Sequence, residues 1–490
     1  MPVARLRVAC FLFKGTMVPG RYGMRQIFLS GLFVSACLPM THALGQSATT
    51  SSASTGTELL ASSSLTDGSG LRTSYDASAA AAVAATSSNA VDSLPGSREN
   101  MAVGTSSIGP SEAQERVQQG GDATAEAIGP YDPLGMRLGQ FLFYPSLTLW
   151  GEATDNVDAT ASGEDGVGVS PEIAAKLQSD WSRHSLTLNG SAAIKGYQTP
   201  NRKPEDDEHL SGELRLDMAD DTQLTISGSF DRSQEDKGSV ELNATGQSAT
   251  YETGMTGGLT LDHQAGLVDL QLRGSVGAMR YEDEDSRDYD TYRVGARVGV
   301  ALTDQIMPFV DAELTRRQYK DDNHRQNGDS LRGAIGIEVS NREKLSGELS
   351  AGVISWDPDL AGQSGDTAFF VDASLAWSPN ALWTIRGGLE TDLTSTSTVA
   401  RSVATHRVSL EADYAILRNL ELTASGAIAQ ETYNGIGRHD WVFDATLNAT
   451  YSFNRNVQLI ASVGRSQRDS NLAGEDTTTH TVRLGLRLQR

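Results

Sequence analysis

The chain has 490 residues, a net charge of −22 and 21% charged residues. No stretch beyond the N-terminal region has the roughly 20 consecutive apolar residues that a membrane-spanning helix needs. The acidic balance argues against a nucleic-acid partner, because no continuous basic face is available to neutralise phosphates. The two cysteines, Cys10 and Cys37, both lie near the N-terminus, so the rest of the chain can form neither a disulfide framework nor a thiolate metal site.

The N-terminal region has the pattern of a secretory signal peptide. A short basic segment, Met24-Arg25-Gln26, precedes an apolar core over 27–34 and small residues suited to cleavage near Ala43. We therefore predict a signal peptide over 1–43, with translation starting at Met1, Met17 or Met24. A second hypothesis is that Val34–Cys37 acts as a lipobox and that Cys37 carries a lipid.

Residues 44–130 are rich in Ser, Ala, Thr and Gly and poor in large apolar side chains. Such a segment cannot bury enough surface to offset its chain entropy. We predict a disordered periplasmic tail. The alternative, that it folds onto a periplasmic partner, has no motif to support it.

The remainder, 131–490, is organised as repeated strands of period two. In the last strand Val482, Leu484, Leu486 and Leu488 share one face, and polar residues or glycine occupy the other. A chain that alternates in this way throughout, with no helices to cover the apolar face, is typical of a β-barrel in a lipid bilayer. We predict about eighteen strands, around 138–153, 173–177, 186–194, 210–218, 224–230, 251–261, 268–276, 292–300, 306–314, 331–339, 345–353, 369–377, 383–389, 408–414, 420–428, 441–453, 457–463 and 479–490.

The predicted connections alternate between short and long. The short turns are Asn/Asp-rich, as tight hairpins prefer, and include 219–221, 303–305, 340–343, 378–380, 417–419 and 454–456. The long loops include 199–208, 232–246, 282–290, 319–329, 357–366 and 469–478. Outer-membrane barrels have short turns in the periplasm and long loops outside. The pattern predicts an all-β, antiparallel, up-and-down transmembrane barrel with its N-terminal tail and C-terminus in the periplasm.

Aromatic residues near the strand ends are candidates for the interfacial girdles of such a barrel. They are Trp150, Trp181, Tyr197, Phe230, Tyr251, Tyr281, Trp377, Trp383, Tyr414, Tyr433, Trp441 and Phe453. The alternative for these residues is edge packing in a soluble sheet.

The polar faces of the strands would line the lumen. The candidate pore-lining residues are Lys176, Arg273, Arg293, Arg297, Asp311, Glu313, Arg332, Glu338, Arg386, Arg407, Glu411, Arg483 and Arg487. Arg273, Arg293 and Arg297 fall on neighbouring strands, and the next strand carries Asp311 and Glu313. This separation could set a transverse field that selects solutes. The other hypothesis is that the charges pair across strands and brace the wall.

No catalytic motif is present, so we expect no enzymatic activity, no cofactor and no metal site. A hydrolase built from Ser and His at the barrel rim stays open as a hypothesis, because such a constellation is spatial. The acidic loops, such as 205–208 and 282–285, fit a solvated rim; binding of divalent cations that bridge to lipopolysaccharide is the alternative.

The start of the predicted barrel resembles a known family. The segments Tyr131–Gly139, Phe141–Leu147, Asp155–Val157, Ser170–Glu172 and Gln178–His184 are similar to the first strands of the proteobacterial outer-membrane β-barrel porins of the second type. The resemblance covers about 130–490. It implies an outer-membrane location and, because members are often linked to exopolysaccharide production, a role in polysaccharide passage. It implies no catalytic residues.

We therefore expect a porin-like channel for hydrophilic solutes, with exopolysaccharide export as its specific form. One alternative is a non-conducting structural or assembly partner of a periplasmic polysaccharide export system. The other is the rim hydrolase of lipid or glycan. The expected partners are outer-membrane lipid and lipopolysaccharide, the barrel-assembly machinery and polysaccharide export components.

Overall fold

The structure is a computed structural model that describes residues 130–198, 204–219, 221–235, 250–320, 327–341, 344–360, 362–396 and 400–490. The predicted signal peptide and all but the last residue of the predicted tail lie outside the described residues. Within the described part of the chain, no helix is long and apolar enough to cross a membrane.

Strands account for most of the described residues. They are β1 (Met136–Leu138), β2 (Phe141–Thr154), β3 (Gly166–Ser179), β4 (Ser185–Tyr197), β5 (Glu205–Ala219), β6 (Thr222–Gln234), β7 (Tyr251–Ala265), β8 (Val268–Tyr281), β9 (Tyr289–Val300), β10 (Ile306–Tyr319), β11 (Gly328–Asn341), β12 (Leu345–Pro358), β13 (Asp366–Asn380), β14 (Trp383–Ser395), β15 (Ser402–Leu417), β16 (Leu420–Asn434), β17 (Arg438–Asn454), β18 (Val457–Ser470) and β19 (Thr477–Gln489). A single 3-10 turn, η3 (Asp285–Arg287), lies between β8 and β9 among these residues.

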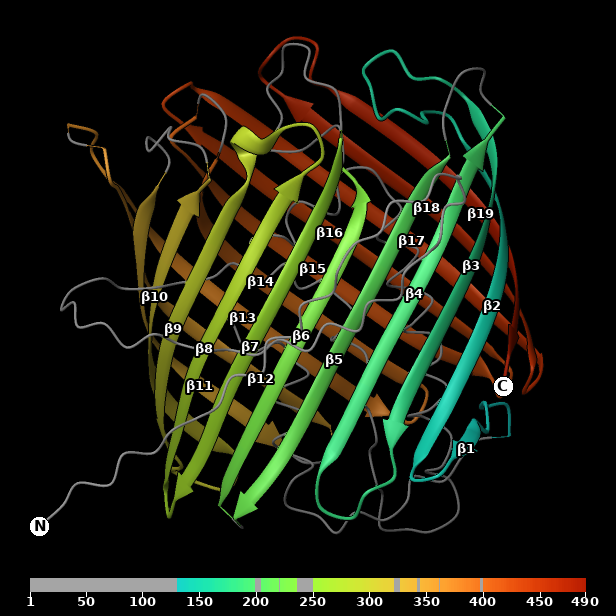
Figure 1. Ribbon diagram of the computed structural model, residues 1–490, viewed down its shortest axis with the longest axis horizontal. Helices are drawn as coiled ribbons and strands as arrows, with labels where there is room; N and C mark the ends of the chain where they lie inside the picture. The colour runs from blue at the N-terminus through green and yellow to red at the C-terminus, as the bar shows by residue number, and fades with distance from the viewer. Residues whose placement is uncertain are drawn as a thin grey trace, which may run out of the picture. The chain divides into compact units, whose positions relative to one another are not determined.

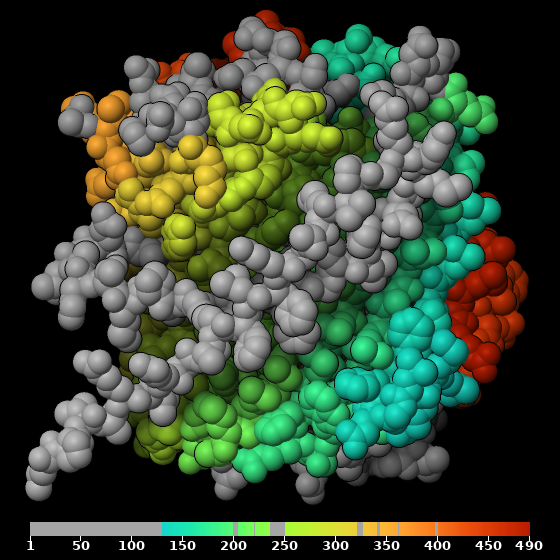
Figure 2. Space-filling view, in the orientation of Figure 1, coloured from blue at the N-terminus to red at the C-terminus, as the bar shows by residue number. Residues whose placement is uncertain are grey.

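The strands β2 to β19 form a closed antiparallel barrel of eighteen strands. Each strand pairs with the next one along the chain, as the ribbon shows (Figure 1). On the visible face of the space-filling view, the colour changes gradually across the wall (Figure 2). The barrel closes where β19 pairs with β2, from Thr481↔Thr154 to Gln489↔Ser146. The short strand β1 pairs with the first three residues of β2, beside the end of β19. The prediction of about eighteen strands is confirmed.

The two ends of the barrel differ in their connections. At one end, called here the short-turn end, the strands are joined by 180–184, 220–221, 266–267, 301–305, 342–344, 381–382, 418–419 and 455–456. At the other, the long-loop end, the connections include 155–165, 235–250, 282–288, 320–327 and 471–476, although 435–437 is short. The predicted alternation is therefore present, while the side of the membrane that each end faces stays a prediction.

The two faces of the wall have opposite chemistry. Along β2, Leu147 and Leu149 are exposed, whereas Thr148 and Glu152, on the other face, are almost fully buried. The same alternation is strict through β17 and β19. In a closed barrel the buried polar face is the interior, so the exposed apolar face surrounds the molecule. An apolar exterior of this extent fits a lipid environment.

The girdle prediction is partly wrong. Trp377, Trp383, Trp441 and Phe453 are exposed on the apolar face, and Trp383 stacks on Tyr414 with ring centroids 4.2 Å apart. However, Trp150, Tyr197, Tyr281 and Tyr433 lie on the interior face, because each has the parity of the buried polar residues of its strand. A position near a strand end does not decide which side a residue faces, because the pleat of the strand does.

Candidate pore lining

All thirteen candidate pore-lining residues lie on the interior face of their strands. The strand register carries this face from one strand to the next: Asp311 of β10 is opposite Arg297 of β9, and Glu313 is opposite Arg332 of β11. Arg386 of β14 is likewise opposite Glu411 of β15. A period-two side-chain pattern and a continuous ladder are sufficient to place these residues together.

The charges of β8 to β12 pair with one another. Arg273 lies 2.8 Å from Asp311, and Arg293 lies 3.0 Å from Glu313. Arg297 contacts Asp311 at 3.2 Å and Glu348 of β12 at 2.9 Å. These side chains are nearly all buried. Of the two hypotheses for the charges, the contacts favour pairing that braces the wall.

Two further groups of interior charges occur in other parts of the wall. Arg386 contacts Glu411 at 2.8 Å and also binds Asp413. At the closing seam, Arg483 lies 3.1 Å from Glu152. Close by, Arg487 donates from Nε to the hydroxyl of Thr148 at 3.1 Å. Lys176, Arg407 and Glu338 also lie on the interior face.

The sequence reasoning missed a cluster of charges near the long-loop end of β16 to β18. Arg468 lies 2.8 Å from both Glu431 and Asp440, and neither carboxylate is exposed. Arg438 contacts the same Asp440 at 2.6 Å. The signal for this cluster is available in the sequence, since all four residues have the parity of the polar face.

The burial of the interior side chains differs around the barrel. Most interior side chains of β9, β10 and β17 to β19 are buried, whereas most of those of β4 to β7 are half-buried. The accessible face carries many hydroxyl and amide groups, including Thr187, Asn189, Ser191, Ser211, Thr225, Ser229, Thr256 and Thr260. On β4 to β7, a solute inside the barrel would therefore meet hydroxyl and amide groups interspersed with charged side chains such as Glu213, Arg215 and Asp231.

A Ser–His–Asp arrangement lies on this same face. His209 Nδ1 is 2.5 Å from Asp231 Oδ1, and His209 Nε2 is 3.2 Å from the hydroxyl of Ser211. His209 and Ser211 are two residues apart on β5, and Asp231 is opposite His209 on β6. The two ring nitrogens thus hold different partners, as a base between a nucleophile and an orienting carboxylate would. The sequence predicts a hydrolase site only at the rim and does not identify this group, which joins two strands.

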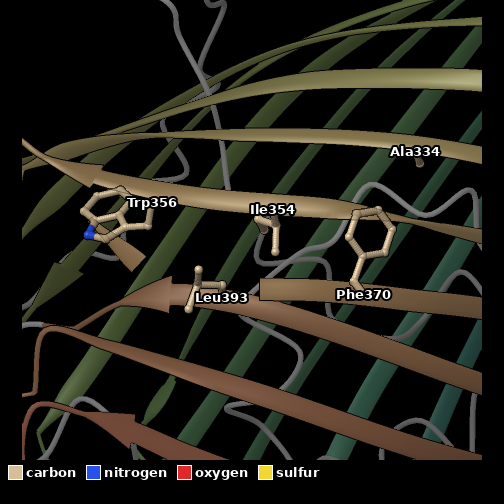
Figure 3. Close-up of a cluster of buried hydrophobic side chains, with 5 residues drawn as sticks. All are labelled: Ala334, Ile354, Trp356, Phe370 and Leu393. Carbon is tan, nitrogen blue, oxygen red and sulfur yellow. The ribbon is translucent and has the colours of Figure 1, made fainter. Parts of the chain in front are cut away.

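The end of β14 separates from β13 but stays paired with β15. The residues of β14 beyond Leu389 no longer pair with β13. Instead, Leu393 joins a buried apolar cluster with Ile354 and Trp356 of β12, Phe370 of β13 and Ala334 of β11 (Figure 3). These four partners have the parity of the interior face. The end of β14 therefore lies against the inside of β11 to β13.

The chain was compared with protein families and with known structures. The family model described as "Putative beta-barrel porin 2" matches residues 129–490. A BenF-like porin from Pseudomonas fluorescens Pf-5 is similar at 11% identity and a TM-score of 0.43, covering 72% of this chain and 100% of its own. OccK2 (OpdF) from Pseudomonas aeruginosa is similar at 11% identity and a TM-score of 0.42, with 72% and 98% covered. No curated protein matches the chain.

Proposed function

Because the chain belongs to the β-barrel porin 2 family, we propose that it is an outer-membrane channel through which hydrophilic solutes pass. The observation that carries the proposal is the half-buried, polar interior face of β4 to β7 inside a closed barrel with an apolar exterior. Such a wall separates a lipid environment from a hydrated path.

The neutral hydroxyl and amide groups of β4 to β7 support polyhydroxylated solutes as the transported class. A sugar chain offers many hydroxyls, each of which can exchange hydrogen bonds with Ser, Thr and Asn side chains at little cost in desolvation. We therefore propose passage of carbohydrate, with exopolysaccharide export as its specific form.

The test of the channel is single-channel conductance of the refolded mature chain in a planar bilayer. We expect stable conductance steps, and a decrease when a soluble oligosaccharide is added to one side. A folded barrel that conducts no ions in any condition would overturn the proposal.

The paired interior charges provide a second readout in the same bilayer. Replacing Arg293 and Arg297 by Gln leaves Glu313, Asp311 and Glu348 with fewer cationic partners. We expect the reversal potential to shift towards cation selectivity. Arg465→Gln, on the outer face of β18, is the matched control and should leave selectivity unchanged.

The orientation of the barrel is part of the proposal, with the short-turn end in the periplasm. Leu472, in the 471–476 connection, and Arg418, in the 418–419 turn, are both exposed and lie at opposite ends. In intact cells a membrane-impermeant maleimide should label Leu472→Cys and not Arg418→Cys. Labelling of Arg418→Cys and not of Leu472→Cys would show the opposite orientation.

The non-conducting structural role is the main alternative, and the extensive pairing of interior charges supports it. In that case the tail over 44–130 would hold a periplasmic export component. Deletion of the tail should then remove that component from purified complexes while leaving the conductance of the barrel unchanged.

A second candidate function is hydrolysis of an ester, and the specific observation that favours it is the Ser211–His209–Asp231 arrangement. Ser211 would attack the ester carbonyl while His209 Nε2 takes its proton; the ester C–O bond would break, and the alcohol would leave with that proton. Water, deprotonated by His209, would then hydrolyse the acyl-serine to the free acid and restore Ser211. Its location inside the wall favours a hydrophilic ester in the lumen. A fluorophosphonate probe should then label the wild type and Ser229→Ala, the residue opposite Ser211, but not Ser211→Ala. Equal labelling of all three would exclude the site.

A further inference from the structure

The ladder between β13 and β14 covers only part of their length. It runs from Asn380↔Trp383 at the short-turn end to Ala373↔Leu389 and stops there. Beyond that point, residues 366–372 of β13 pair only with β12, and residues 390–395 of β14 pair only with β15. Open strand edges are unfavourable in a membrane, because their backbone groups lose hydrogen bonds. We call residues 390–395 the gate strand.

Side chains from the wall replace the lost backbone partners of the gate strand. The N–H of Thr391 donates to Asp372 Oδ1 at 2.9 Å, and Arg332, which also binds Asp372, donates to the Thr391 carbonyl at 3.5 Å. Arg317 of β10 donates to the carbonyl of Ser395 at 2.6 Å. The two gate-strand residues that take part, Thr391 and Ser395, are both odd-numbered. In an antiparallel sheet the backbone groups of alternate residues point to the same neighbour, so these groups are the ones that would otherwise bond to β13.

Apolar contacts hold the same segment against the interior. Leu393 points towards Ile354, between Trp356 and Phe370 (Figure 3), and all four side chains are almost fully buried. At the long-loop end, the hydroxyl of Ser402 donates to Asp366 at 2.7 Å. On the side away from β15, the gate strand is thus attached by side chains rather than by a ladder to β13.

The sequence also fits a second position, in the wall. If the ladder continued in the register of Ala373↔Leu389, Thr391 would be opposite Val371 and Leu393 opposite Phe369. Phe369 is 83% exposed on the apolar face, so Leu393 would join the lipid-facing surface beside it. Glu390, Asp392 and Thr394 would then face the interior, as the period-two pattern of the other strands requires.

We propose that the gate strand moves between these two positions, lying inside the barrel in the closed state and completing the ladder with β13 in the open state. The proposal rests on the proposed channel function. On opening, the three backbone groups now bound by Asp372, Arg332 and Arg317 would instead form hydrogen bonds with β13. The interior face of β11 to β13 would then no longer be covered by the gate strand.

Cysteine pairs can lock each position, because the sequence has only Cys10 and Cys37, both in the predicted signal peptide. Ile354→Cys with Leu393→Cys should lock the closed state. Phe369→Cys with Leu393→Cys should lock the open state. Val353→Cys with Phe369→Cys joins residues that are already opposite each other in the wall and is the matched control. A short bifunctional thiol reagent links each pair in the folded barrel, and conductance is measured before and after linking.

We expect the open pair to link and to raise the conductance several-fold, the closed pair to link and to lower it, and the control pair to leave it unchanged. Failure of the open pair to link, or equal conductance in all three linked barrels, would overturn the gate. Equal, steady conductance would leave the channel proposal intact. Linked barrels that never conduct would instead overturn the channel.

If replacing Leu393 prevents folding, a second cysteine pair that keeps Leu393 can test the same proposal. Val371→Cys with Thr391→Cys tests the same open register. In addition, Asp366→Ala removes the acceptor of Ser402 and should raise the fraction of time spent at high conductance. An unchanged open fraction in Asp366→Ala, together with no linking of the second pair, would also overturn the gate.

Discussion

At the closing seam between β19 and β2, Trp150 limits the size of the side chain that position 485 can hold. Trp150 is fully buried on the interior face and donates from its indole N–H to Glu172 at 2.8 Å. Gly485 of β19 is opposite it, and a Cβ at that position would come within 2.5 Å of the Trp150 ring. Arg483 also lies over the ring, 4.5 Å from its centroid.

We therefore predict that Gly485→Ala destabilises the barrel by about 1–3 kcal/mol, the usual cost of overpacking. Urea unfolding in lipid vesicles, followed by tryptophan fluorescence, measures the change. Gly151→Ala is the control, because its new methyl group would point outward with its nearest neighbour 3.9 Å away. Equal losses in both variants would contradict the steric explanation.

For the cluster around Arg468, we predict a large loss of stability when Arg468 is replaced. Arg468→Met leaves Glu431 without its guanidinium partner and leaves Asp440 with Arg438 alone. Removing one partner of a buried ion pair typically costs about 3–5 kcal/mol, because the remaining charge is uncompensated. Arg465→Met, on the exposed face of the same strand, should change stability by less than about 0.5 kcal/mol. The same urea titration distinguishes the two.

At the scale of elements, β2 and β19 are joined at their long-loop ends by a polar contact. The backbone N–H of His480 donates to Asp155 Oδ1 at 2.7 Å, and the ring Nδ1 lies 2.7 Å from Oδ2. Partial burial would raise the pKa of Asp155, but the hydrogen bonds and charge of His480 outweigh it and hold the pKa below its ordinary value of 3.8.

The sign of the pH dependence follows from that direction. A carboxylate with a lowered folded-state pKa stabilises the fold above its unfolded pKa, and the contribution is lost as pH falls through the folded value. We predict that Asp155→Asn lowers the urea midpoint slightly at neutral pH and that the difference from wild type vanishes below pH 3.8, as the wild-type carboxylate becomes protonated. A difference that persists at the lowest pH would contradict this account.

β14 is the element whose position depends most on its surroundings. Its sequence alternates like that of any other strand, yet its last six residues lie inside the wall. The interior faces of β12 and β13 carry Ile354, Trp356 and Phe370, which form one apolar cluster with Leu393. Burying one leucine against such a patch stabilises by about 1.5–3 kcal/mol, which is comparable with the loss of a few ladder hydrogen bonds.

For the whole molecule, closure is the property that makes the barrel stable in a bilayer. The β19–β2 ladder removes the last open edge. Deletion of residues 477–490 would expose one edge of β18 and one of β2. We predict that this variant does not reach the folded state, as measured by the mobility difference between heated and unheated samples in gel electrophoresis. Deletion of residues 44–129, outside the matched family region, should leave that folded form intact; a folded C-terminal deletion would contradict the role of closure.

The sequence by itself determined the fold class, the number of strands and the face on which each charge lies. These properties follow from local patterns: a period of two, Asn/Asp-rich turns and alternating loop lengths. Each of the thirteen candidate residues could therefore be assigned to the polar face without a structure. The same parity would have placed Trp150 and Tyr433 inside, and would have marked Ile354, Trp356 and Phe370 as apolar residues on the wrong face.

Only the tertiary structure decided how the interior charges pair, which side chains approach His209, and that the end of β14 separates from β13. These outcomes depend on distances across several strands: Arg297 reaches Glu348 three strands along the sheet, and Arg317 reaches Ser395 four strands along. The pleat fixes the side of each residue locally, but a contact between distant strands depends on the curvature of the closed sheet and on side-chain packing inside it. No pattern within one strand contains that information.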